Sequence, residues 1–427
     1  MMNAIKVERI ADGVYFNSVR DSRFKTMRIT ANLILPLCAE TASENALLAG
    51  VLTRSCRAYP DFTALSRRLA YLYGADLSFA VHKIGDRQLI SITVSGLDDR
   101  YALGDESVAR ELSLLLCCAI FEPNFDADGL FVASDVEQER RQLLDTIEAE
   151  FNDKRLYANA RMISEMCSGE CYGVRRFGTA EQVAAVTAEQ LVEAWKRMLK
   201  TSQVQIMYIG DSSPDRVKEV FSDAFAKIVR QPSEIVSTAS YDVAGVMEFG
   251  DEMELSQSKL VMGFRTGISG DADEVNRARL MCAVLGGTVS SKLFLNVREK
   301  QSLCYYCASR YDRQKGIMVV DSGVENANLE RTRDAILKEI EDMKNGVISD
   351  FELESAKLAV INSFRSSNDT VGGIESWYSS QLFDKNYLSI EQLSDSVDAV
   401  TKEEVVEAAK MLKLDTVYML RGTGVSE

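Results

Sequence analysis

The sequence has 427 residues, of which 46% are hydrophobic and 26% are charged, and its formal net charge is −15 at pH 7. A chain of this length is too long for one hydrophobic core and predicts two or more domains. The acidic balance leaves no basic stripe to neutralise phosphates, which argues against nucleic acid as a partner. Because no apolar run could cross a bilayer and the N-terminus lacks signal-peptide features, we expect a cytoplasmic protein with no membrane partner.

Histidine and cysteine usage narrows the possible chemistry further. His82 is the only histidine, so a metal site built from several histidines of this chain is impossible. We interpret His82 as a solvated residue at a strand end. The nine cysteines are an odd number and do not form a disulfide framework. The "CYYC" stretch from Cys304 to Cys307 lies in a predicted strand, where alternation would place the two thiols on opposite faces, and we interpret them as free thiols.

In chain order, the first half begins with a strand at 28–37 that leads into a short apolar helix at 44–52. Residues 62–96 then read as a helix, a glycine-terminated turn, a strand, a second turn and a strand. One face of the last strand is predicted to be buried from the alternation of Ile90, Ile92 and Val94.

The second half repeats this order. A strand at 258–267 leads into a helix at 274–285, and residues 290–324 again read as helix, strand, turn and strand. Hairpin-linked strands together with long amphipathic helices are typical of an α+β fold with a largely antiparallel sheet.

The clearest sign of duplication is the match between residues 187–211 and 401–422. Both segments contain an amphipathic helix with "VEA" and "MLK", followed by a strand. Both helices are predicted to begin with a capping box, formed by Thr187 with Gln190 and by Thr401 with Glu404. The spacing is about half the chain, which indicates a duplicated domain and not a solenoid.

We therefore predict two homologous domains, each a mainly antiparallel sheet covered by helices. The first spans 1–232 and the second spans 245–427. A segment at 233–244 with poor helical periodicity is the predicted linker.

The stretch "GGTVSSKLFLNVREKQSLCYY" resembles the C-terminal half of the pitrilysin/insulinase-type zinc metallopeptidases, the inverzincins. Family-like features cover nearly the whole chain, and the resemblance implies the fold of LuxS and the mitochondrial processing peptidase. The family's paired arginine and tyrosine map onto Arg298 and Tyr305, which implies a substrate-binding role for them. Without the resemblance, Arg298 reads as an arginine that complements a helix dipole, and Tyr305 reads as a tyrosine packed on a strand.

The same resemblance implies that a zinc site has been lost. Active members carry H-x-x-E-H on the helix after the first strand, with two zinc-binding histidines and a glutamate as general base. Here the histidine positions become Ala46 and Gly50, and the base becomes Ala49. On the family's long helix, Glu139 matches the first glutamate and the metal-ligand position becomes Thr146. We therefore predict no metal, no cofactor and no catalytic residue in this chain.

A charge-dense helix offers one other possible cation site. Asp145, Glu148 and Glu150 with Glu139 could bind a hard cation such as Mg²⁺. The alternative interpretation of these residues is an ordinary solvated helix face.

The leading hypothesis is a non-catalytic bacterial member of the family. It would contribute half of a peptide-binding chamber to a zinc-bearing paralogue, with zinc only in that partner and a peptide or unfolded protein as substrate. A second hypothesis is a homodimeric peptide-binding or structural protein without enzymatic activity. A third is a zinc-dependent endopeptidase with non-standard ligands.

Overall fold

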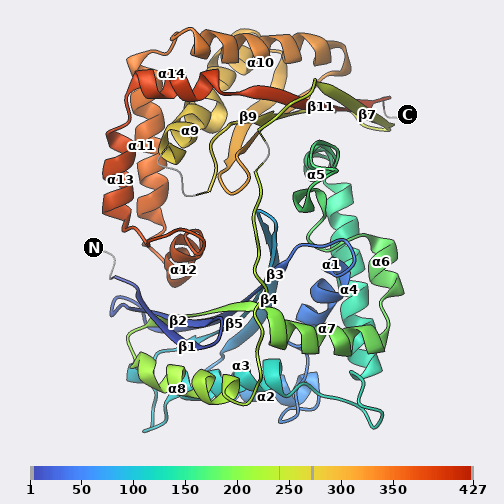
Figure 1. The fold of residues 1–427 in the computed structure, drawn as a ribbon, viewed down its shortest axis with the longest axis vertical. Coiled ribbons are helices and arrows are strands. Elements are labelled where there is room, and N and C mark those ends of the chain that lie inside the picture. The colour runs from blue at the N-terminus through green and yellow to red at the C-terminus, as the bar shows by residue number, and fades with distance from the viewer. Residues whose placement is uncertain (1–3, 240, 271–273, 425–427) are drawn as a thin grey trace. The chain divides into compact units, whose positions relative to one another are not determined.

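Two β-sheets organise the chain in the computed structural model, which describes residues 4–239, 241–270 and 274–424 (Figure 1). Each sheet belongs to one of two compact units. The first unit runs to Glu148 and adds Val174–Val236 and Ser367–Ser379. The second consists of Ala149–Gly173, Ser237–Ser366 and the chain from Ser380 onward.

The sheet of the first unit has six strands in the order β1-β2-β6-β3-β5-β4. Its strands are β1 (Lys6–Ala11), β2 (Val14–Arg20), β3 (Thr26–Pro36), β4 (Asp76–Ile84), β5 (Arg87–Leu97) and β6 (Gln203–Gly210). Only β2 and β6 pair in parallel, and the other neighbours are antiparallel.

The predicted buried face of β5 is confirmed. Ile90, Ile92 and Val94 all belong to the hydrophobic core of this unit. Ser91 and Thr93 on the opposite face of β5 are also buried. Their hydroxyl groups are hydrogen-bonded to the neighbouring strand: Thr93 shares a hydrogen bond with Thr30 at 2.9 Å, and Ser91 donates to Asn32 at 2.6 Å.

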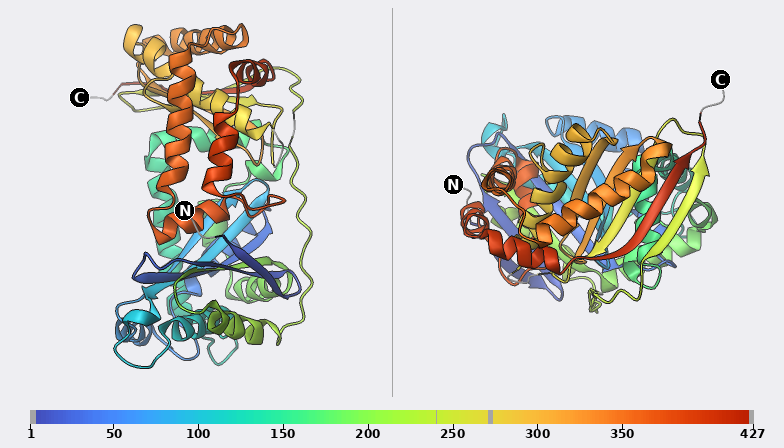
Figure 2. Two further views of the ribbon diagram at one scale, coloured as in Figure 1. Left: turned by 90° about the vertical axis from the view of Figure 1, so that its left-hand side faces the viewer. Right: turned by 90° about the horizontal axis from the view of Figure 1, so that it is seen from above.

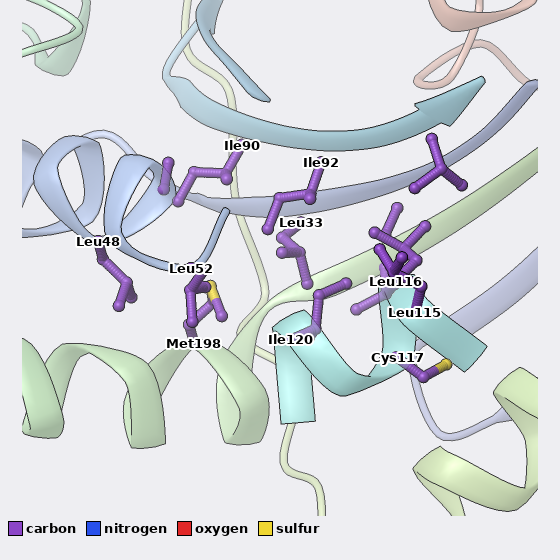
Figure 3. Packing of buried hydrophobic residues seen from close by; sticks show 14 of the residues in the cluster. Leu33, Leu48, Leu52, Ile90, Ile92, Leu115, Leu116, Cys117, Ile120 and Met198 are labelled. Carbon is purple, nitrogen blue, oxygen red and sulfur yellow. The ribbon is translucent and has the colours of Figure 1, made fainter. Parts of the chain in front are cut away.

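Helices pack against this sheet and close the core. They are α1 (Ala42–Val51), α2 (Phe62–Tyr71), α3 (Val108–Phe121), α4 (Ala133–Asn152), α6 (Ala180–Ala185), α7 (Ala188–Thr201) and α8 (Pro214–Phe225), with a 3₁₀ turn η1 (Asp99–Tyr101). Figure 3 shows apolar side chains from α1, α3, α7 and the strands meeting in one cluster. Burial of these apolar side chains is the main source of stability for the packing of the helices on the sheet.

The sheet of the second unit has five strands in the order β7-β11-β8-β10-β9. Its strands are β7 (Met247–Met253), β8 (Ser258–Arg265), β9 (Cys304–Asp312), β10 (Ile317–Val324) and β11 (Lys413–Gly422). The β7–β11 pair is parallel and the others are antiparallel. This order matches β2-β6-β3-β5-β4 of the first sheet strand for strand, so the predicted α+β fold with two duplicated domains is confirmed.

The second unit also contains helices from both parts of the chain. These are α5 (Lys154–Met166), α9 (Val275–Cys282), α10 (Leu329–Lys344), α11 (Asp350–Ser366), α13 (Ile390–Asp398) and α14 (Lys402–Lys410), the π-helical segments η3 (Ala283–Gly287) and η4 (Leu293–Lys300), and the 3₁₀ turns η2 (Cys171–Gly173) and η5 (Asn326–Asn328). The right-hand view of Figure 2 shows α10 lying across the strands of this sheet.

Each unit also contains one helix from the other half of the sequence. Helix α12 (Val371–Ser379) contacts β3 and β6 of the first unit, and α5 contacts β8 and β11 of the second. Gly263 on β8 makes the second contact possible, because a Cβ there would lie 2.6 Å from the sulfur atoms of Met162 and Met166. The predicted domains at 1–232 and 245–427 place neither helix with its partner strands.

The two capping boxes predicted from the repeat are present. Thr187 and Thr401 each accept from the backbone N–H three residues later, and the Gln190 and Glu404 side chains accept from the cap residues. One of the points at which the chain passes from the first unit to the second lies between Val236 and Ser237. That point lies within the predicted linker at 233–244, of which residue 240 is outside the described part.

Candidate functional site

Helix α1, which carries the degenerate zinc-motif positions, is buried along almost its whole length. It packs against β4, β5 and α7. Ala46 and Ala49 belong to the hydrophobic core, so their methyl groups lie among apolar side chains. Asn45 donates to Gln88 Oε1 at 2.9 Å and anchors the helix to β5. Neither alanine provides a donor atom, so the helix offers no metal ligand at these positions.

Gly50, at the second histidine position, lies against the carboxylate of Glu139. A Cβ placed on Gly50 would lie 2.5 Å from Glu139 Oε2, well inside van der Waals contact. Glu139 comes from α4 and is only 5% exposed. The space beside Gly50 is therefore filled by an acidic side chain, and a histidine fits at position 50 only if Glu139 moves.

Arg54 neutralises this buried carboxylate. Its Nη1 lies 3.0 Å from Glu139 Oε1, and its Nε lies 3.7 Å from Asp135 Oδ1. Ser55 donates to the other oxygen of Asp135 at 2.6 Å. The guanidinium also lies 5.1 Å from the centre of the Phe62 ring. We call Arg54, Ser55, Asp135 and Glu139 the Arg54 network. Within this network, Arg54 supplies the positive charge that the buried carboxylate of Glu139 requires.

Thr146, the predicted position of the lost third ligand, is exposed on α4 and its hydroxyl donates to the Gln142 carbonyl at 2.8 Å. The residue of α4 that contacts Gly50 is instead Glu139, seven residues earlier. Arg54 was missed by sequence reasoning. It follows the apolar helix without a motif, and its carboxylate partners lie far away in the sequence.

The residues present do not fit a zinc ion. Zinc sites require three or four N, S or O ligands, and no group of three His, Cys, Asp or Glu residues that could hold a metal occurs in the described ranges. The same search gives no support for the hard-cation alternative on α4. His82 lies exposed on β4. Desolvation, followed by the positive charge of Arg176, lowers the pKa of His82 below 6.5.

In the second unit, η4 carries Arg298 and leads into β9. The preceding glycine-rich segment is needed for close packing, because a Cβ on Gly286 would lie 2.7 Å from the backbone nitrogen of Ser309 on β9. The Arg298 side chain is 39% exposed, with its guanidinium 4.6 Å from the centre of the Phe294 ring. Short π-helical segments are frequent at functional sites.

Tyr305 lies at a β-bulge at the start of β9. Tyr306 pairs with Gly323 of β10, but the next β10 residue, Val324, pairs with Cys304. Tyr305 is therefore the extra residue of the bulge. It is 52% exposed, and its hydroxyl donates to Glu325 at 3.2 Å. The interpretation as a tyrosine packed on a strand is wrong for this residue.

The bulge also corrects the prediction for "CYYC". Cys307 pairs with Ser322, and Cys304 pairs with Val324. Ser322 and Val324 are two residues apart on β10, so they share one face of the sheet and so do their cross-strand partners. The two thiols therefore lie on the same face and not on opposite faces. Both are free in the structure.

Comparison with known proteins agrees with this geometry. A family model described as the peptidase M16 inactive domain matches residues 185–360. The probable inactive metalloprotease YmfF of Bacillus subtilis is 31% identical over 412 residues, covering 96% of each chain. The chain belongs to the peptidase M16 family. The resemblance inferred from the sequence is confirmed, and the protein is an inactive homologue of the M16 peptidases.

Solved structures show the same fold. A conserved protein from Enterococcus faecalis is 28% identical, with a TM-score of 0.92 and coverage of 99% of this chain and 100% of that one. A chain in the structure of complex III2 from Candida albicans has a TM-score of 0.76 at 15% identity, covering 99% of this chain and 96% of that one. In the part of the chain that the structure describes, no helix has the length and apolar character of a membrane span.

Proposed function

We propose that this inactive M16 homologue acts in the cytoplasm as one half of a peptide-binding chamber, whose other half is a zinc-bearing M16 partner chain. The observation that carries the proposal is a contrast between two places in the fold. The zinc-motif positions on α1, which are Ala46, Ala49 and Gly50, are buried and have no ligand atom in their side chains. Arg298 is partly exposed on a π-helical segment, and Tyr305 is exposed at a β-bulge.

The chemistry of the pair suits a peptide. A guanidinium carries several N–H donors in a fixed fork that can bind a peptide carbonyl or a terminal carboxylate. A tyrosine hydroxyl can donate and accept. Strand β9 also forms one edge of its sheet, and an edge strand can pair with the backbone of an extended peptide. Arg298, Tyr305 and this edge would together position the peptide.

A partner chain follows from what this chain lacks. Zinc would be bound only by the partner, since the Arg54 network occupies the space beside Gly50. The similarity to a chain in complex III2 of Candida albicans supports the proposal, because that chain takes part in a larger assembly. The net charge of −15 favours a peptide with basic residues over a nucleic acid.

The experiment mixes the purified chain with the M16 protein of the same genome that retains H-x-x-E-H, and follows cleavage of an internally quenched peptide library. We expect no cleavage by this chain alone. The mixture should cleave at least about tenfold faster than the partner alone, in the range that substrate-positioning contacts contribute.

Variants test which residues are responsible. Arg298→Ala and Tyr305→Phe should each lose most of the stimulation while the complex still forms. Arg331→Ala on α10 and Tyr71→Phe on α2 change exposed residues of the same types and should retain it. Equal activity of the partner with and without this chain would overturn the proposal. A stable homodimer that binds peptides without a partner would replace it with the non-enzymatic alternative.

A further inference from the structure

The bulge at Tyr305 places the side chains of Cys304 and Cys307 on one face of β9. In a regular strand, residues three apart point to opposite faces. Here the extra residue shifts the register between Gly323 and Val324, so both cysteines oppose residues of one β10 face. The two side chains are therefore neighbours on one face of β9.

The two thiols have different surroundings. Cys307 is buried in the hydrophobic core of the second unit, whereas Cys304 is only partly buried. A hydrogen bond from the Cys307 thiol lowers the pKa of Cys304, burial opposes this effect, and the positive charge of Arg298 adds to it. The hydrogen bond with Cys304 and burial raise the pKa of Cys307. This is the arrangement of a nucleophilic thiol beside a resolving thiol.

We propose that Cys304 and Cys307 form a reversible disulfide when the chain meets a disulfide-class oxidant such as oxidised glutathione. The Cys304 thiolate attacks one sulfur of the oxidant, and a Cys304–glutathione disulfide forms as one glutathione thiolate leaves. The Cys307 sulfur, after losing its proton, attacks the Cys304 sulfur and releases the second glutathione. In total, two protein thiols become one disulfide, and one oxidised glutathione becomes two reduced molecules.

The disulfide would enclose Tyr305 in a small ring. The residues between the two cysteines are Tyr305 and Tyr306, so the bond fixes the bulge that presents Tyr305. Resting on the proposed function, we infer that oxidation restricts the side chain that contacts the peptide and lowers the stimulation of the partner. Reduction would restore it.

The first experiment needs neither peptide nor partner. The native chain is incubated with oxidised glutathione, alkylated and mapped by mass spectrometry. We expect a Cys304–Cys307 disulfide that dithiothreitol removes. In Cys307→Ser, Cys304 should instead keep one bound glutathione. Cys171 is exposed in the same unit and serves as the control thiol, with glutathione attached but no intrachain disulfide.

The rate separates a folded site from mere closeness in sequence. The native chain should form the disulfide about tenfold faster than the chain in urea, because the bulge holds the two side chains on one face of the strand. The proposal would be overturned if the disulfide formed at equal rates in the native chain and in urea. It would also be overturned if a Cys304–glutathione adduct persisted in the wild-type chain, or if Cys304 and Cys307 stayed reduced after Cys171 had reacted.

The second experiment tests the consequence for function. The oxidised chain should stimulate the partner less than the reduced chain, and the variant with Cys304→Ala and Cys307→Ala should respond to neither reagent. If the disulfide forms but stimulation is unchanged, the inference about Tyr305 is wrong. If the partner is never stimulated, the proposed function fails while the disulfide result still stands.

Discussion

The region around Gly50 and the region around Tyr305 have opposite surroundings. At Gly50 a buried carboxylate and a guanidinium fill the space beside the degenerate motif. At Tyr305 a bulge turns an aromatic side chain outward and leaves it 52% exposed. The first region resembles a protein core, and the second resembles a binding surface. The contrast is the basis of the proposal that the chain binds a peptide for a partner and performs no chemistry of its own.

The largest expected effect is on the Arg54 network. Glu139→Ala removes the main partner of a largely buried guanidinium, and we expect the free energy of unfolding to fall by about 3 kcal/mol. Urea denaturation measures this change. Glu137→Ala, on the same helix, removes a carboxylate that is 58% exposed in its ion pair with Arg140 and should cost less than about 0.5 kcal/mol. Similar losses for the two variants would contradict the account of the first region.

The next effect concerns the glycine at the second histidine position. Gly50→Ala places a Cβ 2.5 Å from Glu139 Oε2, and we expect a loss of about 2 kcal/mol from overpacking. The matched control is Gly372→Ala on α12, where a Cβ meets nothing within 4 Å. There the higher helix propensity of alanine should raise the free energy of unfolding by about 0.5 kcal/mol. Equal stabilities for the two variants would show that the space beside Gly50 is open.

A smaller effect distinguishes the second region. Ser302 lies between η4 and β9 with φ of 51°, the left-handed conformation that glycine adopts without strain. Ser302→Gly should therefore stabilise the chain by about 0.5 kcal/mol. Ser302→Ala keeps the Cβ and should bring no gain. A destabilised glycine variant would show that this connection is not strained.

The smallest expected effect concerns His82. Because its pKa in the folded chain lies below 6.5, protonation favours the unfolded chain. The free energy of unfolding is therefore unaffected by His82 above about pH 6.5 and decreases as the pH falls through that value, because the unfolded chain then binds the proton more tightly. NMR can follow the ring protons of this single histidine directly. Arg176→Gln should raise the pKa of His82, and a lowered or unchanged value would contradict the assignment. Added zinc should not shift these signals.

Much of the fold and the absence of a histidine-based site could be predicted from the sequence, because they depend on local patterns and composition. The helix starts at Thr187 and Thr401 follow from side chains three residues apart. The duplication follows from repeated segments, and the loss of a histidine-based site follows from the presence of a single histidine.

The rest depends on contacts between distant parts of the chain. Arg54 meets Glu139 only after α1 and α4 have packed. The bulge at Tyr305 exists only in the register that β9 adopts with β10, so counting residues along one strand placed Cys304 and Cys307 on opposite faces. The exchange of α5 and α12 between units has no signal in their own sequences.

The central proposal is that this chain, which has both halves of the fold, binds no metal of its own and contributes only peptide contacts. The most direct measurement is the zinc content of the purified chain after equilibration with excess zinc and removal of free metal. We predict less than about 0.1 zinc per chain, because fewer than the three ligands that a zinc site requires are present at the motif. About one zinc per chain, together with peptide cleavage that a chelator abolishes, would contradict the account.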